Sequence, residues 1–544
     1  MTDSKIQIIS APWQSPRPCF RTEFPLDLPP SAAFVYRSAN NMALLSAGSC
    51  VFTPPAFDGE YPSEDVIVVG DEKSGTYILA GALTARRSLS YFTLIKHGRF
   101  HSIEVKQPEI APDGTPEELI CLEGNDWRKL LIEYAERSAE AMGVRPFSAE
   151  TNLVGYCSWY YYYANVTEAD VLENLSALAK SENRRRFPVD YFQIDDGYQA
   201  FQGDWLERRA SWPSPLAETA AKIQAQGIRP GIWVMPFIAS TASRTFREHP
   251  EWFVKNPAGE PLIFNGWSPP PDNHWACLDA TQPEVREHMQ MIFRTLYGYG
   301  FRFFKMDGLG FALPEGVRSD PEATAVSAFR AGLTAIHEAV PEATLLGCGA
   351  PFMPCLGLVD NCRISNDTGR SWHLSRPVNN ADPNLSDPCI ANALHAVRAN
   401  WWMLDRWFRA DPDAIMVRQD NIFTTEGEAR ISLLTAILTG ISVTSDNLRT
   451  IAPERLKLLG KSVSLRLFEP VPESWACDTW CQVFKGRCNG KSGVIIFNDS
   501  AEPCSFDLTE LGFAEGVAEE LLQERRICRV LQVPPHDGAL LCEV

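Results

Sequence analysis

Short apolar runs separated by turn residues fill the first part of the chain, up to about residue 125. They lie at Ala33–Tyr36, Asp65–Val69, Gly75–Leu79, Tyr91–Lys96 and Phe100–Val105. Short strands at this spacing predict an antiparallel β-sandwich. A helix is then predicted over Trp127–Met142, because its apolar residues recur at helical spacing and share one face.

From about residue 150 the pattern changes to apolar runs that alternate with helical segments. The predicted strands are Leu153–Cys157, Val189–Ile194, Ile228–Met235, Phe301–Met306, Thr344–Cys348, Leu358–Ser365, Ala414–Val417 and Ile441–Thr444. A capping box at Thr167 and prolines at 283 and 321 predict where three of the helices begin. Eight such units favour a (β/α)8 TIM barrel, although the fifth crossover is short. A doubly wound open sheet is the alternative.

The C-terminal part of the chain again contains strand-like apolar runs, at Val494–Phe497 and Ala539–Cys542. We therefore expect a multidomain protein in which a central TIM barrel at 146–465 lies between two β-domains. The first, at 1–145, is an antiparallel β-sandwich with a linker helix, and the second, at 466–544, is a small C-terminal β-domain.

The charge of the 544-residue chain limits its partners. Its formal net charge of −18 disfavours nucleic acid and anionic membrane surfaces. No apolar run approaches the ~20 residues that cross a bilayer, and the first residues lack a basic and then apolar signal pattern. The chain is therefore predicted to be cytoplasmic.

The fifteen cysteines are scattered along the chain and show no C-x-x-C spacing, and no H-E-x-x-H motif occurs. We expect mostly buried, reduced thiols and neither a metal site nor a cofactor. The chain also lacks a phosphate-binding loop, a dinucleotide-binding motif and a G-x-S-x-G nucleophile elbow.

Polar side chains follow several of the predicted barrel strands, where the reacting groups of such barrels lie. The set contains Asp195, Asp196, Lys305, Asp307, Arg363 and Asp367, with Trp159, Tyr160 and Trp233 at neighbouring strand ends. Two carboxylates that face each other across a cleft can cleave a glycosidic bond, and the remaining polar groups can bind sugar hydroxyls. A cation two residues before Asp307 keeps that carboxylate ionised.

Simpler structural roles also fit each of these residues alone. An Asp after a strand often caps the next helix, and Asp-Asp-Gly is a common turn sequence. Trp233 taken alone is typical of a core residue, and Asp411-Pro412-Asp413 is interpreted as the turn into the seventh strand. Their joint occurrence at successive strand ends favours a site.

Five motifs resemble glycoside hydrolase family 36, the family of α-galactosidases, α-N-acetylgalactosaminidases and raffinose-type synthases. They are Gly155-Tyr-Cys-Ser-Trp-Tyr160, Gln193-Ile-Asp-Asp-Gly-Tyr198, Pro230-Gly-Ile-Trp233, Phe304-Lys-Met-Asp-Gly308 and Arg363-Ile-Ser-Asn-Asp367. The resemblance spans residues 150 to 445. Gly308-Leu309-Gly310 replaces the Asn that follows the nucleophile in longer members, so the chain is similar to the shorter prokaryote-type branch, and no tetramer is inferred.

The resemblance implies a role for each matching residue. Asp307 would be the nucleophile and Asp367 the acid/base, while Asp195 and Asp196 would hold the axial 4-hydroxyl and the 6-hydroxyl of galactose. The other implied substrate-binding residues are Lys305, Arg363, Trp233, Trp159, Tyr160 and Cys348. The N-terminal domain of family members can add an aromatic residue to the pocket, but no such residue is identified here.

The leading hypothesis is a retaining exo-α-galactosidase acting on an oligosaccharide or glycoconjugate. It requires the pKa of Asp367 to exceed that of Asp307, and carboxyl groups about 5–6 Å apart. One alternative is a raffinose-synthase-like transglycosidase, which differs only in the acceptor. Another is an α-N-acetylgalactosaminidase or a glucosidase, and a third is a sugar-binding protein without activity.

Overall fold

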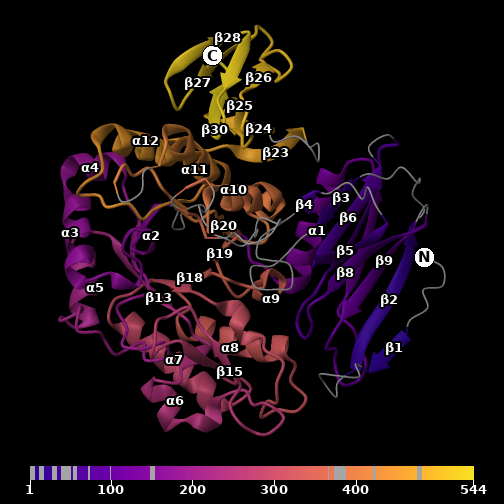
Figure 1. Ribbon diagram of the computed structural model, residues 1–544, viewed down its shortest axis with the longest axis vertical. Coiled ribbons are helices and arrows are strands. Elements are labelled where there is room, and N and C mark those ends of the chain that lie inside the picture. Colours follow the sequence, from indigo (N-terminus) through magenta and orange to yellow (C-terminus); the bar gives the residue numbers. More distant parts are fainter. Residues whose placement is uncertain are drawn as a thin grey trace.

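The computed structural model describes thirteen segments of the chain. They are residues 7–10, 18–26, 34–37, 51–52, 58–71, 74–97, 100–147, 154–365, 367–369, 371–372, 388–420, 424–474 and 481–544. Figure 1 shows a central barrel with an antiparallel β-domain at each end of the chain, as predicted.

The N-terminal domain consists of two five-stranded antiparallel sheets. The first sheet runs β1 (Gln7–Ser10), β2 (Pro18–Leu26), β9 (Phe100–Gln107), β8 (Tyr91–His97) and β5 (Gly59–Glu64). The second runs β10 (Leu119–Gly124), β7 (Thr76–Ala82), β6 (Val66–Asp71), β3 (Phe34–Arg37) and β4 (Val51–Phe52). Helix α1 (Trp127–Met142) packs on β7, since a Cβ at Gly81 would lie only 2.5 Å from the Tyr134 ring.

The barrel strands form one parallel sheet in the order β20-β19-β18-β17-β13-β12-β11-β22-β21. Their bounds are β11 (Val154–Cys157), β12 (Tyr191–Ile194), β13 (Arg229–Val234), β17 (Phe303–Met306), β18 (Thr344–Gly347), β19 (Asn361–Arg363), β20 (Arg409–Asp411), β21 (Ala414–Ile415) and β22 (Ser442–Thr444). All eight predicted strands are present, and the corresponding observed strands lie within the predicted bounds.

The first and last strands of this order, β20 and β21, are joined only by Pro412 and Asp413. Asp413 has a φ of 79°, which breaks the strand at this point. Each half pairs with a different neighbour, β19 or β22, so the sheet closes on itself. The alternative of an open doubly wound sheet is therefore wrong.

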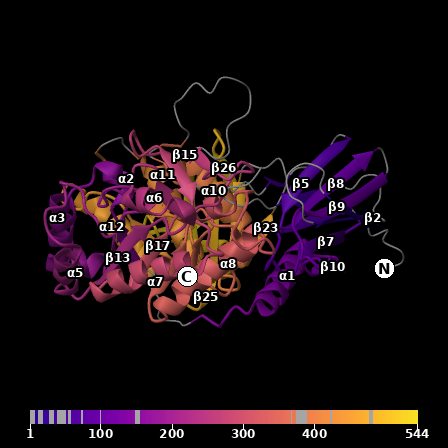
Figure 2. The same ribbon diagram turned by 90° about the horizontal axis from the view of Figure 1, so that it is seen from below.

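Helices cover the outside of the barrel (Figure 2). The α-helices of this part of the chain are α2 (Trp159–Tyr162), α3 (Glu168–Ala179), α4 (Ser181–Arg186), α5 (Leu216–Gln224), α6 (Arg244–Glu248), α7 (Pro283–Gly298), α8 (Ala325–Ala339), α9 (Phe352–Cys355), α10 (Ile390–Ala399), α11 (Glu426–Thr439) and α12 (Pro453–Ser464). Thr167 caps α3 and α7 begins at Pro283, as predicted. Helix α8 begins at Ala325 and not at Pro321, because Thr324 forms a capping box with Ser327.

A small antiparallel sheet is inserted between β13 and β17, which are neighbours in the barrel. It contains β14 (Ile238–Ser240), β16 (His274–Cys277) and β15 (Ile263–Asn265), in that order. In Figure 2, β15 lies at the same side of the barrel as α2, which follows the carboxyl end of β11. The insertion therefore stands beside the end of the barrel that carries reacting groups.

The C-terminal domain has a six-stranded sheet and a two-stranded sheet. The larger contains β23 (Phe468–Ser474), β24 (Cys481–Cys488), β25 (Lys491–Asn498), β30 (Asp537–Cys542), β27 (Val517–Glu520) and β28 (Arg525–Cys528). The smaller pairs β26 (Cys504–Asp507) with β29 (Val530–Val533). Helix α11 docks on β30, where the Arg430 guanidinium donates to both carboxylate oxygens of Asp537 at 2.8 and 2.7 Å.

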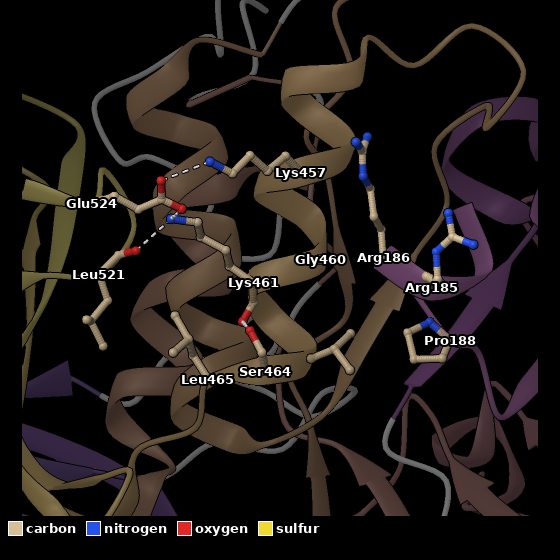
Figure 3. Close-up of a pocket in the computed structure, with 11 residues that line it drawn as sticks. Arg185, Arg186, Pro188, Lys457, Gly460, Lys461, Ser464, Leu465, Leu521 and Glu524 are labelled. Carbon is tan, nitrogen blue, oxygen red and sulfur yellow. Dashed lines mark hydrogen bonds and ion pairs between the residues drawn. The ribbon is translucent and has the colours of Figure 1, made fainter. Parts of the chain in front are cut away.

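A pocket of about 480 Å³ opens where α4 and α12 meet the loop after β27 (Figure 3). The Lys461 ammonium donates to the carbonyls of Leu521 and Leu522 at 2.7 and 2.9 Å, and lies 2.9 Å from Glu524. Lys457 also pairs with Glu524. The lysines of this pocket therefore hold the C-terminal domain against the barrel.

Helix length and the state of the cysteines are two further properties of the described segments. Within the described segments, no helix is long and apolar enough to span a membrane. Ten described cysteines are free thiols, and eight of them are buried, as expected. Cys504 is disulfide-bonded, so the expectation of reduced thiols is wrong at that position.

Candidate active site

The barrel strands are parallel, so their carboxyl ends meet at one end of the barrel. Asp195 and Asp196 directly follow β12, and Asp307 directly follows β17. Arg363 is the last residue of β19. The strand order therefore gathers these side chains at one end, as the sequence pattern predicts.

Asp307 is held by three neighbouring groups. The Trp233 indole N–H donates to its Oδ2 at 3.0 Å, and the backbone N–H of Gly308 donates to its Oδ1 at 2.7 Å. The Lys305 ammonium lies 3.8 Å from Oδ2. Burial alone would raise the pKa of Asp307, but Lys305, Trp233 and Arg363 outweigh it and hold that pKa below its ordinary value. Asp307 is thus an ionised, oriented carboxylate.

Lys305 lies between two acids. Its ammonium is 2.9 Å from Asp195 Oδ2 and 3.8 Å from Asp307 Oδ2, and its side chain is buried. Burial lowers the pKa of Lys305, yet the charge of Asp195 raises it well above its usual range. The lysine is therefore a permanent cation that couples the ends of β12 and β17.

Asp195 is nearly saturated with donors. Its Oδ2 accepts from Gln193 Nε2 at 2.7 Å, from Lys305 Nζ at 2.9 Å and from Cys157 Sγ at 3.2 Å. Its Oδ1 accepts the backbone N–H of Asp196 at 2.9 Å. Asp195 therefore serves first to position Lys305.

Asp196 has more free bonding capacity than Asp195. Its Oδ1 accepts from Gln199 Nε2 at 2.5 Å and from Gln202 Nε2 at 3.4 Å. Its Oδ2 has no hydrogen-bond partner among the described residues. Burial, reinforced by the charge of Asp195, raises the pKa of Asp196 to about 6. This carboxyl is thus available to bind a hydroxyl group.

The side chain of Arg363 contacts four oxygen atoms at the end of β19. Its guanidinium donates to Asp367 Oδ1, to Tyr160 Oη at 3.3 Å and to the Ser365 carbonyl at 2.9 Å. It also lies 2.9 Å from Asp413 Oδ2. The side chain of Asp367 is 41% exposed, in contrast to that of Arg363 at 4%, so Asp367 is the solvent-facing member of this pair.

Charges from both halves of the site act on Cys348, which follows β18. Burial raises the pKa of this thiol well above its usual range, and the charges of Asp307 and Asp367 raise it further. Arg363 and Lys305 act on the same thiol in the opposite direction. Both expected catalytic carboxylates are therefore close enough to Cys348 to influence it.

The aromatic residues at the strand ends differ in what they contact. Trp233 is fully buried, with its edge against Trp205 at 5.7 Å between ring centroids, so it holds Asp307 through its N–H and offers no stacking face. Tyr160 is also buried, and its hydroxyl contacts Asp413 and Arg363. Trp159 is only half-buried and packs edge-on against Tyr163 at 5.2 Å.

Three residues of the site were not among the sequence-based candidates: Gln199, Gln202 and Asp413. The two glutamines lie three and six residues after Asp196 and bind its Oδ1. The sequence pattern predicts that Asp413 belongs to a turn. It does break a strand, but its buried carboxyl contacts Arg363 and Tyr160, and burial raises its pKa to about 6. The sequence feature that could have identified Asp413 is a second acid beside a proline at the end of a strand.

The described residues contain no cluster of three or more His, Cys, Asp or Glu side chains that could hold a metal ion. The pocket at the domain seam (Figure 3) is lined by Arg185, Arg186, Lys457 and Lys461 and contains none of the expected catalytic carboxylates. The carboxylate pair at the barrel end is therefore the better candidate for glycosidic chemistry.

The central part of the chain is similar to one family model and to several curated proteins. The model of the glycosyl hydrolases family 31 TIM-barrel domain matches residues 153–338. The α-galactosidase Mel36A of Lactobacillus acidophilus is 24% identical over 177 residues, which are 32% of this chain and 23% of that protein. The bifunctional α-galactosidase/sucrose kinase AgaSK of Mediterraneibacter gnavus is 26% identical over 137 residues, 24% of this chain and 13% of that protein. These matches thus span less than a quarter of each relative.

Solved structures extend the likeness in fold to almost the whole chain. The α-galactosidase TtGalA of Thermus thermophilus, in complex with a nitrophenyl α-galactoside, has a TM-score of 0.68 at 21% identity, over 90% of this chain and 98% of that one. The family 36 α-galactosidase AgaA of Geobacillus stearothermophilus has a TM-score of 0.63 at 13% identity, over 97% and 79% of the two chains. The sequence relatives and the shared fold together confirm the resemblance of this chain to the α-galactosidases of glycoside hydrolase family 36.

Proposed function

We propose that this protein is a retaining exo-α-galactosidase that removes terminal α-galactosyl residues by double displacement. The observation that carries the proposal is the state of Asp307: an ionised carboxylate, fixed by Trp233 and Gly308 and balanced by Lys305. A nucleophile that attacks an anomeric carbon needs a charged oxygen held in one orientation. TtGalA, which shares the fold, was solved in complex with an α-galactoside.

In the first step, an oxygen of Asp307 attacks the anomeric carbon while protonated Asp367 gives its proton to the leaving oxygen. The bond from carbon to the leaving group breaks as the bond to Asp307 forms. In the second step, Asp367 takes a proton from water, the water oxygen attacks the same carbon and Asp307 is released. The products are galactose and the free aglycone.

Arg363 suits this exchange of protons because it faces two carboxylates. When Asp367 is protonated, Asp413 at 2.9 Å still supplies a counter-charge to the buried guanidinium. When Asp367 is ionised, its contact with Arg363 stabilises it. Arg363 would thus assist both states of the acid/base, in addition to binding a ring hydroxyl.

Selection of galactose is assigned to the end of β12. Asp196 has a free carboxylate oxygen that can accept an axial hydroxyl, and Gln199 and Gln202 fix its orientation. The proposed oligosaccharide or glycoconjugate substrate needs no cofactor for this chemistry. The three domains are proposed to divide near residues 145 and 465.

The competing function with the same residues is transfer of the galactosyl group to a sugar acceptor. An α-N-acetylgalactosaminidase would differ in the glycone. A panel of nitrophenyl α- and β-glycosides tests the proposal: we expect release of nitrophenol from the α-galactoside and from no β-glycoside or α-glucoside. Turnover of the N-acetylgalactosaminide alone, or of no compound at all, would contradict it. Galactosylated products formed from excess raffinose would identify the transferase.

A further inference from the structure

Trp267 is an exposed tryptophan beside the site. It lies in the loop between β15 and β16, residues 266–273, and is 49% exposed. Its ring packs edge-on against Trp275 at 4.6 Å and tilts against Phe311 at 5.9 Å, measured between centroids. Its indole N–H has no hydrogen-bond partner among the described residues. One face of the ring and the N–H therefore remain available to a ligand.

The loop that carries Trp267 is built to hold one shape. The backbone N–H of Gly266 donates to the carbonyl of Asn273 at 2.9 Å, and the Trp275 indole donates to the carbonyl of Asp272 at 2.7 Å. A Cβ at position 266 would lie 2.1 Å from the Trp275 ring, so only glycine allows this packing. Asp272 is buried and accepts from the backbone of Gln202 at 3.3 Å, which ties the loop to the residues after β12. Trp267 is thus held in place before any ligand arrives.

A chain of direct contacts joins Trp267 to the proposed nucleophile. Phe311 lies in the short 3-10 helix Leu309–Ala312, four residues after Asp307. Its backbone N–H donates to the carbonyl of Gly308 at 2.9 Å, and the N–H of Gly308 binds Asp307 Oδ1. Phe264 of β15 also stacks on Phe311, at 5.3 Å between ring centroids. The aromatic surface of Trp267 and Phe311 is therefore continuous with the segment that positions Asp307.

We propose that Trp267 and Phe311 form the binding surface for the ring on the leaving-group side of the scissile bond, and that this ring is a sugar. This inference rests on the proposed galactosidase activity and assigns to Trp267 and Phe311 the recognition of the sugar that leaves. A pyranose ring has an apolar C–H face that matches an exposed indole, and hydroxyls that accept its N–H. A purely apolar partner would leave that N–H without an acceptor.

The test compares substrates that differ only beyond the anomeric carbon. Raffinose has a disaccharide leaving group, nitrophenyl α-galactoside has an aryl ring, and α-galactosyl fluoride has no ring at all. In the variant Trp267→Ala, kcat/KM for raffinose should fall about tenfold while that for the fluoride stays unchanged, since fluoride has no ring that could reach the surface. Trp267→Phe should recover part of the loss.

Ile263→Ala is the matched control, because Ile263 is a 43% exposed apolar residue of β15 with no ring contact to Trp267. This variant should leave kcat/KM for all three substrates unchanged. In Trp267→Ala, an equal fall in kcat/KM for raffinose and for the fluoride, or no fall for either substrate, would overturn the assignment of the surface. If the unaltered protein cleaves none of the three substrates, the galactosidase proposal itself fails.

Discussion

The guanidinium of Arg363 lies 2.9 Å from the carboxylate of Asp413, and both groups are buried. Arg363 also binds Asp367, which faces solvent. The proposed acid/base therefore shares its cation with a second acid that keeps Arg363 balanced while Asp367 carries a proton.

Asp413→Asn tests this sharing. The substitution removes a counter-charge that the buried Arg363 keeps while Asp367 carries a proton. We expect kcat for nitrophenyl α-galactoside to fall about tenfold. An unchanged kcat would show that Asp413 acts only as a strand breaker. Circular dichroism checks that the variant is folded.

Asp307→Ala should abolish turnover of nitrophenyl α-galactoside, by about a thousandfold or more, because no oxygen remains to attack the anomeric carbon. Azide should restore activity in the space left by the carboxylate and give the β-galactosyl azide, the inverted product. Product anomers are read by nuclear magnetic resonance. Activity close to that of the unaltered protein would remove Asp307 from the mechanism.

Lys305→Met should shift the acidic limb of kcat/KM to higher pH, by about one unit or more. Lys305 lowers the pKa of Asp307, so its loss raises that pKa, and a higher pH is then needed to ionise the nucleophile. Lys305→Arg keeps the charge and should leave the acidic limb in place. An unmoved limb in the methionine variant would show that the charge of Lys305 does not control Asp307.

Asp196→Asn should stabilise the protein at neutral pH although it weakens binding of the sugar. The folded pKa of about 6 exceeds the ordinary value of 3.8, so ionisation of Asp196 destabilises the fold as pH rises through this window, by about 3 kcal/mol once complete. We expect a higher Tm than that of the unaltered protein at pH 7, with the gap closing towards pH 4. Asp195→Asn, which removes the partner of buried Lys305, should instead lower Tm.

Lys461→Met should weaken the docking of the C-terminal domain. Its ammonium satisfies the carbonyls of Leu521 and Leu522, and their loss costs about 1–3 kcal/mol. Lys457→Met removes only an exposed contact to Glu524 and serves as the control. Limited proteolysis and Tm of the full chain measure the effect. Equal behaviour of the two variants would contradict this role for Lys461.

Much of the barrel follows from local pattern, because each strand is an apolar run and Thr167 and Pro283 mark helix starts by their own chemistry. Asp195, Lys305 and Asp307 could be gathered from sequence since parallel strands end at one edge. Asp413 could not, because its partner Arg363 lies 50 residues earlier and the contact depends on closure of the sheet. The burial of Trp233 is typical of a lone tryptophan in an apolar run, but its packing against Trp205 is not, because no local pattern connects the two residues.

The small sheet β14–β16 interrupts the chain between two strands that nevertheless lie side by side in the barrel. The residues proposed to cleave the bond thus follow the strands of the barrel itself. Trp267 instead lies in an insertion that leaves the barrel after β13 and returns to it at the neighbouring strand β17. Exchange of this insertion between related enzymes is therefore a route to new substrate ranges that keeps the barrel strands on which the proposed catalytic residues depend.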